Sequence, residues 1–118
     1  MVERGWGRVL SFSMANADRI AANTAVTAHF IAKSGVLSLS RALAKELAPH
    51  HITVNCISPG FIDSKSAPAE ELEKMTKRIP AGYVGGLDDT VAAARFFLSD
   101  ESKYTTGANL QVSGGWGL

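Results

Sequence analysis

The residue types in this chain best suited to chemistry are a histidine and a lysine four positions apart, His29 and Lys33. Residues at this spacing share one face of a helix, so the imidazole and the ammonium are expected to be neighbours. Histidine exchanges protons near neutral pH and can serve as a general acid or base. A charged lysine one turn away favours the neutral imidazole. The pair is therefore a candidate proton-transfer site, and a purely structural role for His29 is the alternative.

A long amphipathic helix over residues 25–48 must position this pair. Its apolar residues recur every three or four positions, which predicts one core-facing stripe. The expected stripe is Val36, Leu37, Leu39, Leu43, Ala44 and Leu47. The β-branched run at residues 52–57 predicts a buried strand directly after the helix. His51 stands between them where a left-handed cap is usual, a conformation that histidine tolerates.

The remaining elements complete an alternating order of strands and helices. We expect a strand at residues 9–13, a loop at 14–23, a charged helix at 69–78, a helix at 90–98 capped by Asp88 or Asp89, and a strand at 108–112. In the helix at 90–98, the expected inward side is Val91, Ala94, Phe97 and Leu98. Alternation of this kind is typical of an α/β fold with a parallel sheet. About three parallel strands, one long core helix and a C-terminal helix make a thin sheet, so we expect a partial Rossmann-like fold.

Composition narrows the function classes. A chain of 118 residues forms one small domain, and its formal charge of +1 gives no basic excess for a nucleic-acid partner. No apolar stretch approaches the roughly 20 residues that a membrane span needs. No secretory leader is visible at the amino terminus, and the single cysteine, Cys56, excludes an internal disulfide. A cytoplasmic location is expected, with Cys56 as a buried apolar residue and no metal site.

Six short motifs then occur in a fixed order along the chain, and they resemble one enzyme family. They lie at residues 7–10, 32–36, 40–48, 52–55, 59–63 and 106–107. Together they resemble the carboxy-terminal half of a short-chain dehydrogenase/reductase and are similar to the 3-oxoacyl-acyl-carrier-protein reductase branch. The resemblance covers essentially the whole chain.

The resemblance implies an oxidoreductase that moves hydride between NAD or NADP and a small carbonyl or alcohol substrate. Family members carry a strand-end serine and a Tyr-x-x-x-Lys pair, in which the lysine assists the tyrosine and holds the nicotinamide ribose. Lys33 matches that lysine. Pro59 and Gly60 match a loop beside the nicotinamide, with Ile62 and Ser64 expected to contact the carboxamide. Residues 64–80 would form the substrate lid.

The sequence departs from this pattern at three places. His29 stands four residues before Lys33 where the family has tyrosine, and one deletion would instead place Phe30 there. Met14 aligns with the family serine. Its neighbour Ser13 is the alternative candidate for the catalytic serine, although it would point to the opposite face of a regular strand. No strand is followed by a glycine-rich turn and a helix, the arrangement that binds a dinucleotide diphosphate.

These departures predict that residues 1–118 form a single partial domain, a truncated reductase fold that does not turn over alone and binds no cofactor by itself. The alternative is a non-catalytic remnant that keeps the oligomer-forming end of the fold. In that family, segments corresponding to residues 90–98 and 108–112 commonly contact a second subunit. A homo-oligomer through these segments is therefore expected under either hypothesis, with no nucleic-acid or membrane partner.

Overall fold

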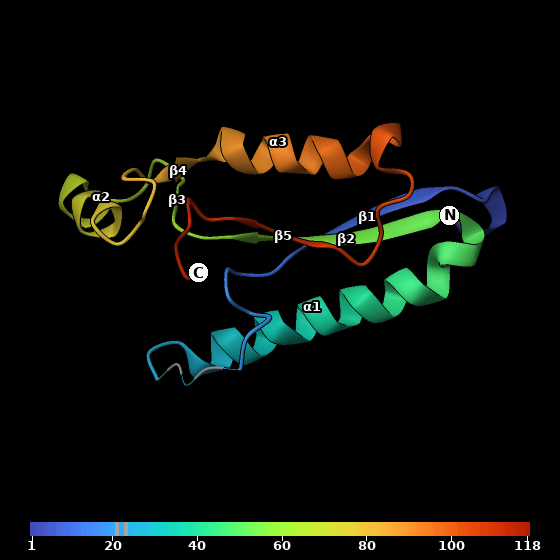
Figure 1. Ribbon diagram of the computed structural model, residues 1–118, viewed down its shortest axis with the longest axis horizontal. Coiled ribbons are helices and arrows are strands. Elements are labelled where there is room, and N and C mark those ends of the chain that lie inside the picture. Colours follow the sequence, from blue (N-terminus) through green and yellow to red (C-terminus); the bar gives the residue numbers. More distant parts are fainter. Residues whose placement is uncertain (21, 23) are drawn as a thin grey trace.

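A computed structural model, which describes residues 1–20, 22 and 24–118, shows a parallel sheet between two helices (Figure 1). Strands β1 (Gly7–Phe12), β2 (Ile52–Pro59) and β5 (Asn109–Val112) are hydrogen-bonded in the order β1-β2-β5. All pairs are parallel, with Gly7 beside Ile52 and Cys56 beside Asn109. The α/β class and the three parallel strands predicted from the sequence are confirmed.

Helix α1 (Thr27–Leu47) covers one face of this sheet. Ala44 packs there against Ile52 and Val54, with Leu43 at the rim of the cluster. The buried residues of α1 are Leu37, Ser40 and Ala44. The prediction that Leu39 belongs to the core face is wrong, because its side chain is 59% exposed. Two residues correspond to about 200° of rotation around a helix, so burial of Leu37 turns Leu39 to the outside.

Helix α3 (Leu87–Leu98) covers the opposite face, where Ala93 and Phe97 pack against Ile57 of β2. Two of its expected inward residues were predicted wrongly: Val91 is 43% exposed and Leu98 is 49% exposed. The buried stripe is centred on Ala93 and Phe97, and this rotation carries both residues outward.

Helix α3 begins at Leu87, earlier than the predicted start at residue 90. One of the two candidate aspartates caps its amino end. The N-cap is Gly86, and its N–H donates to the Asp89 carboxylate at 2.8 Å. This contact satisfies one of the backbone donors that a helix leaves free at its first turn. Asp89 is therefore the capping aspartate.

Short 3₁₀ turns join the main elements. Helix α1 passes into η2 (Ala48–His50), which ends at His51 with φ 57° and confirms the predicted left-handed cap. A first turn, η1 (Val2–Arg4), ends at Gly5 with φ 60° and leads into β1. A third, η3 (Asp100–Ser102), follows α3. The turns η2 and η3 each follow a helix and precede a strand, whereas η1 is the first described element.

The lid segment lies beyond the carboxyl ends of the strands (Figure 1). It contains α2 (Ala69–Thr76), a little shorter than predicted, and it is flanked by a small parallel pair formed by β3 (Ile62–Asp63) and β4 (Gly85–Gly86). This pair was not predicted, since two residues are too few to show a period. Within the described residues, no helix is both long and apolar enough to cross a membrane.

The loop between β1 and α1 starts at Ser13, one residue earlier than predicted, because β1 ends at Phe12. Its first residues approach β2, where the Ala15 N–H donates to the Pro59 carbonyl at 2.9 Å. The predicted loop at residues 14–23 includes Ala21 and Asn23, which lie outside the described residues.

Candidate active site

The candidate site lies at the carboxyl edge of the sheet, where β1, β2 and β5 end and beyond which the lid segment lies (Figure 1). Backbone hydrogen bonds hold these ends side by side. The Ser13 N–H donates to the Ile57 carbonyl at 2.8 Å, and the Gly60 N–H donates to the Val112 carbonyl at 2.9 Å. In open parallel sheets, this edge is where ligands bind.

Ser13 and Lys33 contact each other through the backbone of α1. The Ser13 hydroxyl donates to the Lys33 carbonyl at 2.8 Å, and the Lys33 ammonium donates to the Phe12 carbonyl at 3.0 Å. Ser13 is buried and Lys33 is half-buried. The two predicted catalytic residues are therefore brought together, with the Ser13 hydroxyl occupied in a structural bond and the ammonium held at the edge of β1.

His29 and Phe30, the two alternatives for the missing tyrosine, have different surroundings. His29 is exposed on the first turn of α1. Phe30 is half-buried and lines a cavity of about 320 Å³ with Ala17 and Ser34, between α1 and the loop after β1. The aromatic ring, rather than the imidazole, therefore faces this loop, and it has no group that can transfer a proton.

The loop at Pro59 and Gly60 brings the ends of β2 and β5 very close. A Cβ atom on Gly60 would lie 2.9 Å from the Ser113 Cα and 2.8 Å from its Cβ, so only glycine fits there without displacement. Ile62 follows in β3 and lines a cavity of about 240 Å³ together with residues of β4 and β5. The Ser64 hydroxyl is exposed and pairs with that of Ser66 at 2.7 Å.

Two buried polar side chains beneath the site were not assigned a role from the sequence. Asn55 donates to the Thr105 carbonyl at 2.8 Å and accepts from the Ala108 N–H at 3.1 Å. Ser58 donates to the Asn109 side chain at 2.6 Å. Asn55 within the β-branched run and Ser58 directly after it were the available signal, because buried polar groups require partners. They fix β2 against the segment that leads into β5.

A cluster of two aromatic rings and an arginine side chain was also not predicted from the sequence. The rings of Phe61 and Trp116 lie 4.6 Å apart, and the Arg78 guanidinium lies 5.1 Å from the centre of the Phe61 ring. These residues come from the loop after β2, the last residues of the chain and the turn that follows α2. Their sequence spacing carries no period, so only the folded chain reveals the contact.

Cys56 lies in β2 on the α1 side of the sheet and is fully buried. Burial raises the pKa of its thiol, while a backbone bond from Ser13 and the charges of Lys33 and Arg41 offset part of that effect. The neutral thiol is the stable form, so Cys56 acts as an apolar core residue and not as a nucleophile.

The described residues fit only one end of a dinucleotide cofactor. Lys33, the Pro59–Gly60 loop and the start of the lid segment lie at the edge where a nicotinamide would be expected. The turn between β1 and α1 has no glycine from Arg8 to Ser34, and the N-cap of α1 is Val26 without a side-chain cap. A diphosphate needs close approach to backbone N–H groups at such a turn. These residues therefore do not fit the diphosphate end.

Comparison with known proteins points to the same enzyme family that the sequence motifs resemble. The family model described as "Enoyl-(Acyl carrier protein) reductase" matches residues 1–117. The hydroxy(phenyl)methylsuccinyl-CoA dehydrogenase subunit BbsC of Thauera aromatica is 41% identical over 98% of this chain and 45% of its own. The 3-oxoacyl-acyl-carrier-protein reductase FabG of Salmonella typhimurium is 35% identical over 98% of this chain and 48% of its own.

The fold is similar to that of solved structures over the same extent. A protein from Beutenbergia cavernae, proposed to be an NAD(P)-dependent gluconate 5-dehydrogenase and containing NADP, matches with a TM-score of 0.84 and 34% identity. The match covers 98% of this chain and 48% of that one. The chain therefore spans about half the length of the relatives that it matches.

Proposed function

The chain belongs to the short-chain dehydrogenase/reductase family, and from this membership we propose that it forms the nicotinamide-side and substrate-side part of an NAD(P)-dependent oxidoreductase. Its substrate would be a small carbonyl or alcohol compound. The supporting observation is the position of Lys33, whose ammonium is held at the carboxyl edge of β1 by the Phe12 carbonyl. A cytoplasmic location is part of the proposal and agrees with the buried free thiol of Cys56.

In this proposal the residues of the chain position groups and exclude water. Bound NAD(P) would supply or accept the hydride. Lys33 would orient the ribose with its ammonium, which the Phe12 carbonyl already directs along the sheet edge. The turn at Gly60, together with Ile62, would form one wall, and the lid segment would cover the substrate. The exposed imidazole of His29 is the nearest candidate proton donor in the sequence.

We further propose that the 118-residue chain does not bind cofactor or turn over by itself. The glycine-free turn before α1 offers no diphosphate cradle, and neither His29 nor Phe30 supplies a phenol. In this proposal, the carboxyl edge of the sheet supplies only part of the residues that cofactor binding and hydride transfer require.

Fluorescence titration with NADH and NADPH tests this proposal. We expect no binding by the isolated chain at millimolar cofactor. Binding or carbonyl reduction that is lost in Lys33→Ala and kept in Lys45→Ala, which changes an exposed lysine of the same helix, would show that the isolated chain is active. Failure of a reconstituted full-length fold to bind cofactor would reject the oxidoreductase proposal itself.

A second function, a non-catalytic oligomerisation module, is favoured by the outer surface of α3. Leu87, Val91 and Leu98 are exposed along one stripe, and Leu110 of β5 is 39% exposed. They fall in or beside the two segments, residues 90–98 and 108–112, predicted to contact a second subunit. We propose that this stripe forms the contact of a homo-oligomer.

Light scattering after size exclusion measures this association. Val91→Glu places a charge in the stripe and is expected to give monomers, because an unpaired charge is costly at a buried contact. Ala92→Glu, which lies about 100° away around the helix, is the control and should leave the mass unchanged. A wild-type chain that is folded and monomeric would argue against this contact.

A further inference from the structure

Two arginines of this chain lie against aromatic rings, and their surroundings differ. The Arg8 guanidinium lies 5.0 Å from the centre of the Trp6 ring. The Arg78 guanidinium lies 5.1 Å from the Phe61 ring and 6.0 Å from the Trp116 ring. An arginine that lies over an aromatic face keeps the N–H groups at the rim of its plane free for a further partner. The partners of those N–H groups therefore indicate the role of each arginine.

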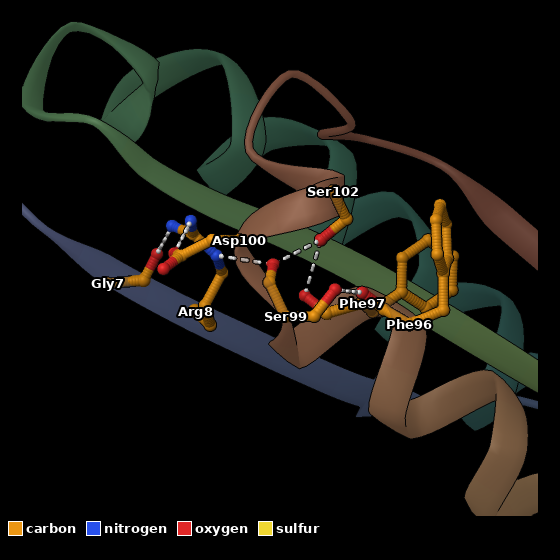
Figure 2. Close-up of polar contacts among 7 residues, drawn as sticks. All are labelled: Gly7, Arg8, Phe96, Phe97, Ser99, Asp100 and Ser102. Atoms are coloured by element: carbon orange, nitrogen blue, oxygen red, sulfur yellow. Dashed lines mark hydrogen bonds and ion pairs between the residues drawn. The ribbon is translucent and has the colours of Figure 1, made fainter.

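Arg8 has partners for its charge and for its N–H groups. Figure 2 shows it reaching from β1 to the end of α3, where it donates to the Ser99 carbonyl at 3.5 Å and to the Asp100 carboxylate at 3.0 Å. It also donates to the Gly7 carbonyl at 3.0 Å, and its side chain is only 6% exposed. The charge of Arg8 is thus compensated within the fold, and its role is structural.

Arg78 has no such compensation. It is exposed in the turn after α2 and takes part in none of the ion pairs found within the described residues. The two ion pairs of α2 each join a lysine to the glutamate four positions earlier, so these carboxylates are already occupied. A guanidinium that two rings hold in place loses little further freedom when it binds an anion, which favours binding.

The Phe61 ring places Arg78 beside the loop that is expected to face the nicotinamide. Phe61 directly follows Gly60 in the chain and is half-buried. Its carbonyl accepts the Gly85 N–H at 3.2 Å, which ties the start of the lid segment to its end. The guanidinium is therefore only one side chain away from the backbone of that loop.

The Trp116 ring connects Arg78 with the loop after β1. Gly117, the next residue, packs so closely against Asn16 of that loop that a Cβ atom on it would lie 2.6 Å from the Asn16 Cγ. Asn16 has φ 69°, and its buried Oδ1 has no hydrogen-bond partner among the described residues. Backbone strain and unpaired buried polar groups are more common at binding sites than elsewhere. Arg78 therefore lies on the lid side of the carboxyl edge, across Trp116 from the end of β1.

We infer that Arg78 is a specificity-determining residue that binds an anionic group of the substrate, at a distance from the reacting carbonyl or alcohol. The anionic group is a carboxylate or a phosphate, because each offers two oxygens to the planar fork of a guanidinium. Phe61 and Trp116 hold that fork in position. The inference rests on the proposed function, for which it names the substrate class.

Nuclear magnetic resonance of the complete ¹⁵N-labelled chain tests this anion site without cofactor. The Arg78 Nε–H and the Trp116 indole N–H report on the site, and Trp6→Phe removes the only other indole signal. The anionic probes are pyruvate and dihydroxyacetone phosphate, and their neutral counterparts are methyl pyruvate and dihydroxyacetone. We expect saturable shifts of both signals with at least one anion and none with the neutral compounds.

Substitutions separate the charge of Arg78 from its fork. Arg78→Gln should weaken anion binding, measured from the Trp116 signal, by about tenfold or more. Arg78→Lys keeps the charge but loses the fork, so its binding should be weaker than that of the wild type. Arg4→Gln makes the same change at an exposed arginine before β1, and as the matched control it should stay within about twofold of the wild type. Unchanged positions of the remaining amide signals show that each variant is folded.

The probe that binds identifies the anionic group, since shifts with dihydroxyacetone phosphate alone assign a phosphate and shifts with pyruvate alone assign a carboxylate. No saturable shift with either anion, equal shifts with the neutral compounds, or undiminished binding by folded Arg78→Gln would overturn the inference. If a reconstituted full-length fold binds the anion but not NADPH, the proposed function is rejected and the anion site remains. If that fold reduces neutral carbonyl compounds as well as anionic ones, the proposed function remains and the inference is overturned.

Discussion

At the scale of single residues, the Cys56 thiol connects burial with stability. It lies at 0% exposure inside β2, and burial raises its pKa above the ordinary value of about 9.0. The folded chain therefore binds the thiol proton more strongly than the unfolded chain does. Its contribution to stability is fully present below the unfolded pKa and is lost as the pH rises toward the folded pKa.

We expect the free energy of unfolding to decrease more steeply with pH in the wild type than in Cys56→Ala once the pH exceeds about 9. Urea denaturation across the alkaline range measures both slopes. In the folded protein, a thiol reagent should react with Cys56 only at the rate of unfolding. Rapid labelling under native conditions, or parallel slopes in the two proteins, would contradict the burial argument.

Ser13 provides a second residue-scale prediction. Its hydroxyl bonds to the Lys33 carbonyl in a buried position. Ser13→Ala is expected to reduce the free energy of unfolding by about 1 kcal/mol, the usual contribution of such a bond. Thermal unfolding measures the loss, and Ser64→Ala, which alters an exposed hydroxyl, is the control. Equal melting temperatures for Ser13→Ala and the wild type would show that water replaces the bond.

The sequence identified Ser13 and Lys33 as candidates but not the bond between them. Helical spacing relates Lys33 to His29 because both lie on one element. The contact from Ser13 crosses from a strand end to a helix, and its geometry depends on how α1 rests on the sheet. Pairwise contacts of this kind are set by tertiary packing, which no local period encodes.

At the scale of elements, the start of α3 is a clear test of helix capping. Asp89 accepts the Gly86 N–H, whereas Asp88 shares the first turn and its favourable charge at the helix N-terminus. Asp89→Ala is expected to lower the free energy of unfolding by about 1 kcal/mol, and Asp88→Ala by a few tenths. Urea denaturation of both variants measures the difference. Equal losses would mean that charge alone stabilises this end.

Elements with strong local signals were predicted well, and elements without them were not. The cap at His51 follows from its place between a helix and a strand, and the order of strands and helices followed from hydrophobic period. The faces of α1 and α3 were partly wrong at Leu39 and Val91, because a stripe of apolar residues wider than the contact does not show which edge is buried. Strands β3 and β4 have two residues each, so nothing in their sequence announced them.

At the scale of the whole molecule, β2 is shared by two separate cores. Ile52 and Val54 pack under α1, while Ile57 packs under α3. Loss of either helix therefore uncovers the central strand, and we expect both layers to unfold together. The lid helix α2 has no fully buried residue and contributes to neither cluster.

Hydrogen exchange should separate these regions. Amides of β2 are expected to exchange only through global unfolding, so their exchange should accelerate with urea as steeply as unfolding itself does. Amides of α2 should exchange through local opening with little dependence on urea. Mass spectrometry of peptides from the two elements measures both. Urea-dependent exchange of α2 equal to that of β2 would show that the lid belongs to the same cooperative unit.

The order of strands and helices was predictable at this scale because each element carries its own hydrophobic period in the sequence. The cluster of Phe61, Arg78 and Trp116 was not, since it gathers three distant segments at one place. Such a cluster forms only when the folded chain brings distant segments together, whereas a sequence pattern describes one segment at a time.

The bonds around Lys33 also determine where a protease can cut. Trypsin needs an extended, accessible backbone on either side of a basic residue, and such sites concentrate in exposed loops. The peptide bond after Lys33 lies within α1, and its carbonyl accepts a hydrogen bond from the Ser13 hydroxyl, whereas Lys65 is exposed in the lid segment. Digestion should therefore nick the folded chain first at Lys65, leaving two fragments that stay associated, and the Lys33 bond should survive until the sheet itself opens.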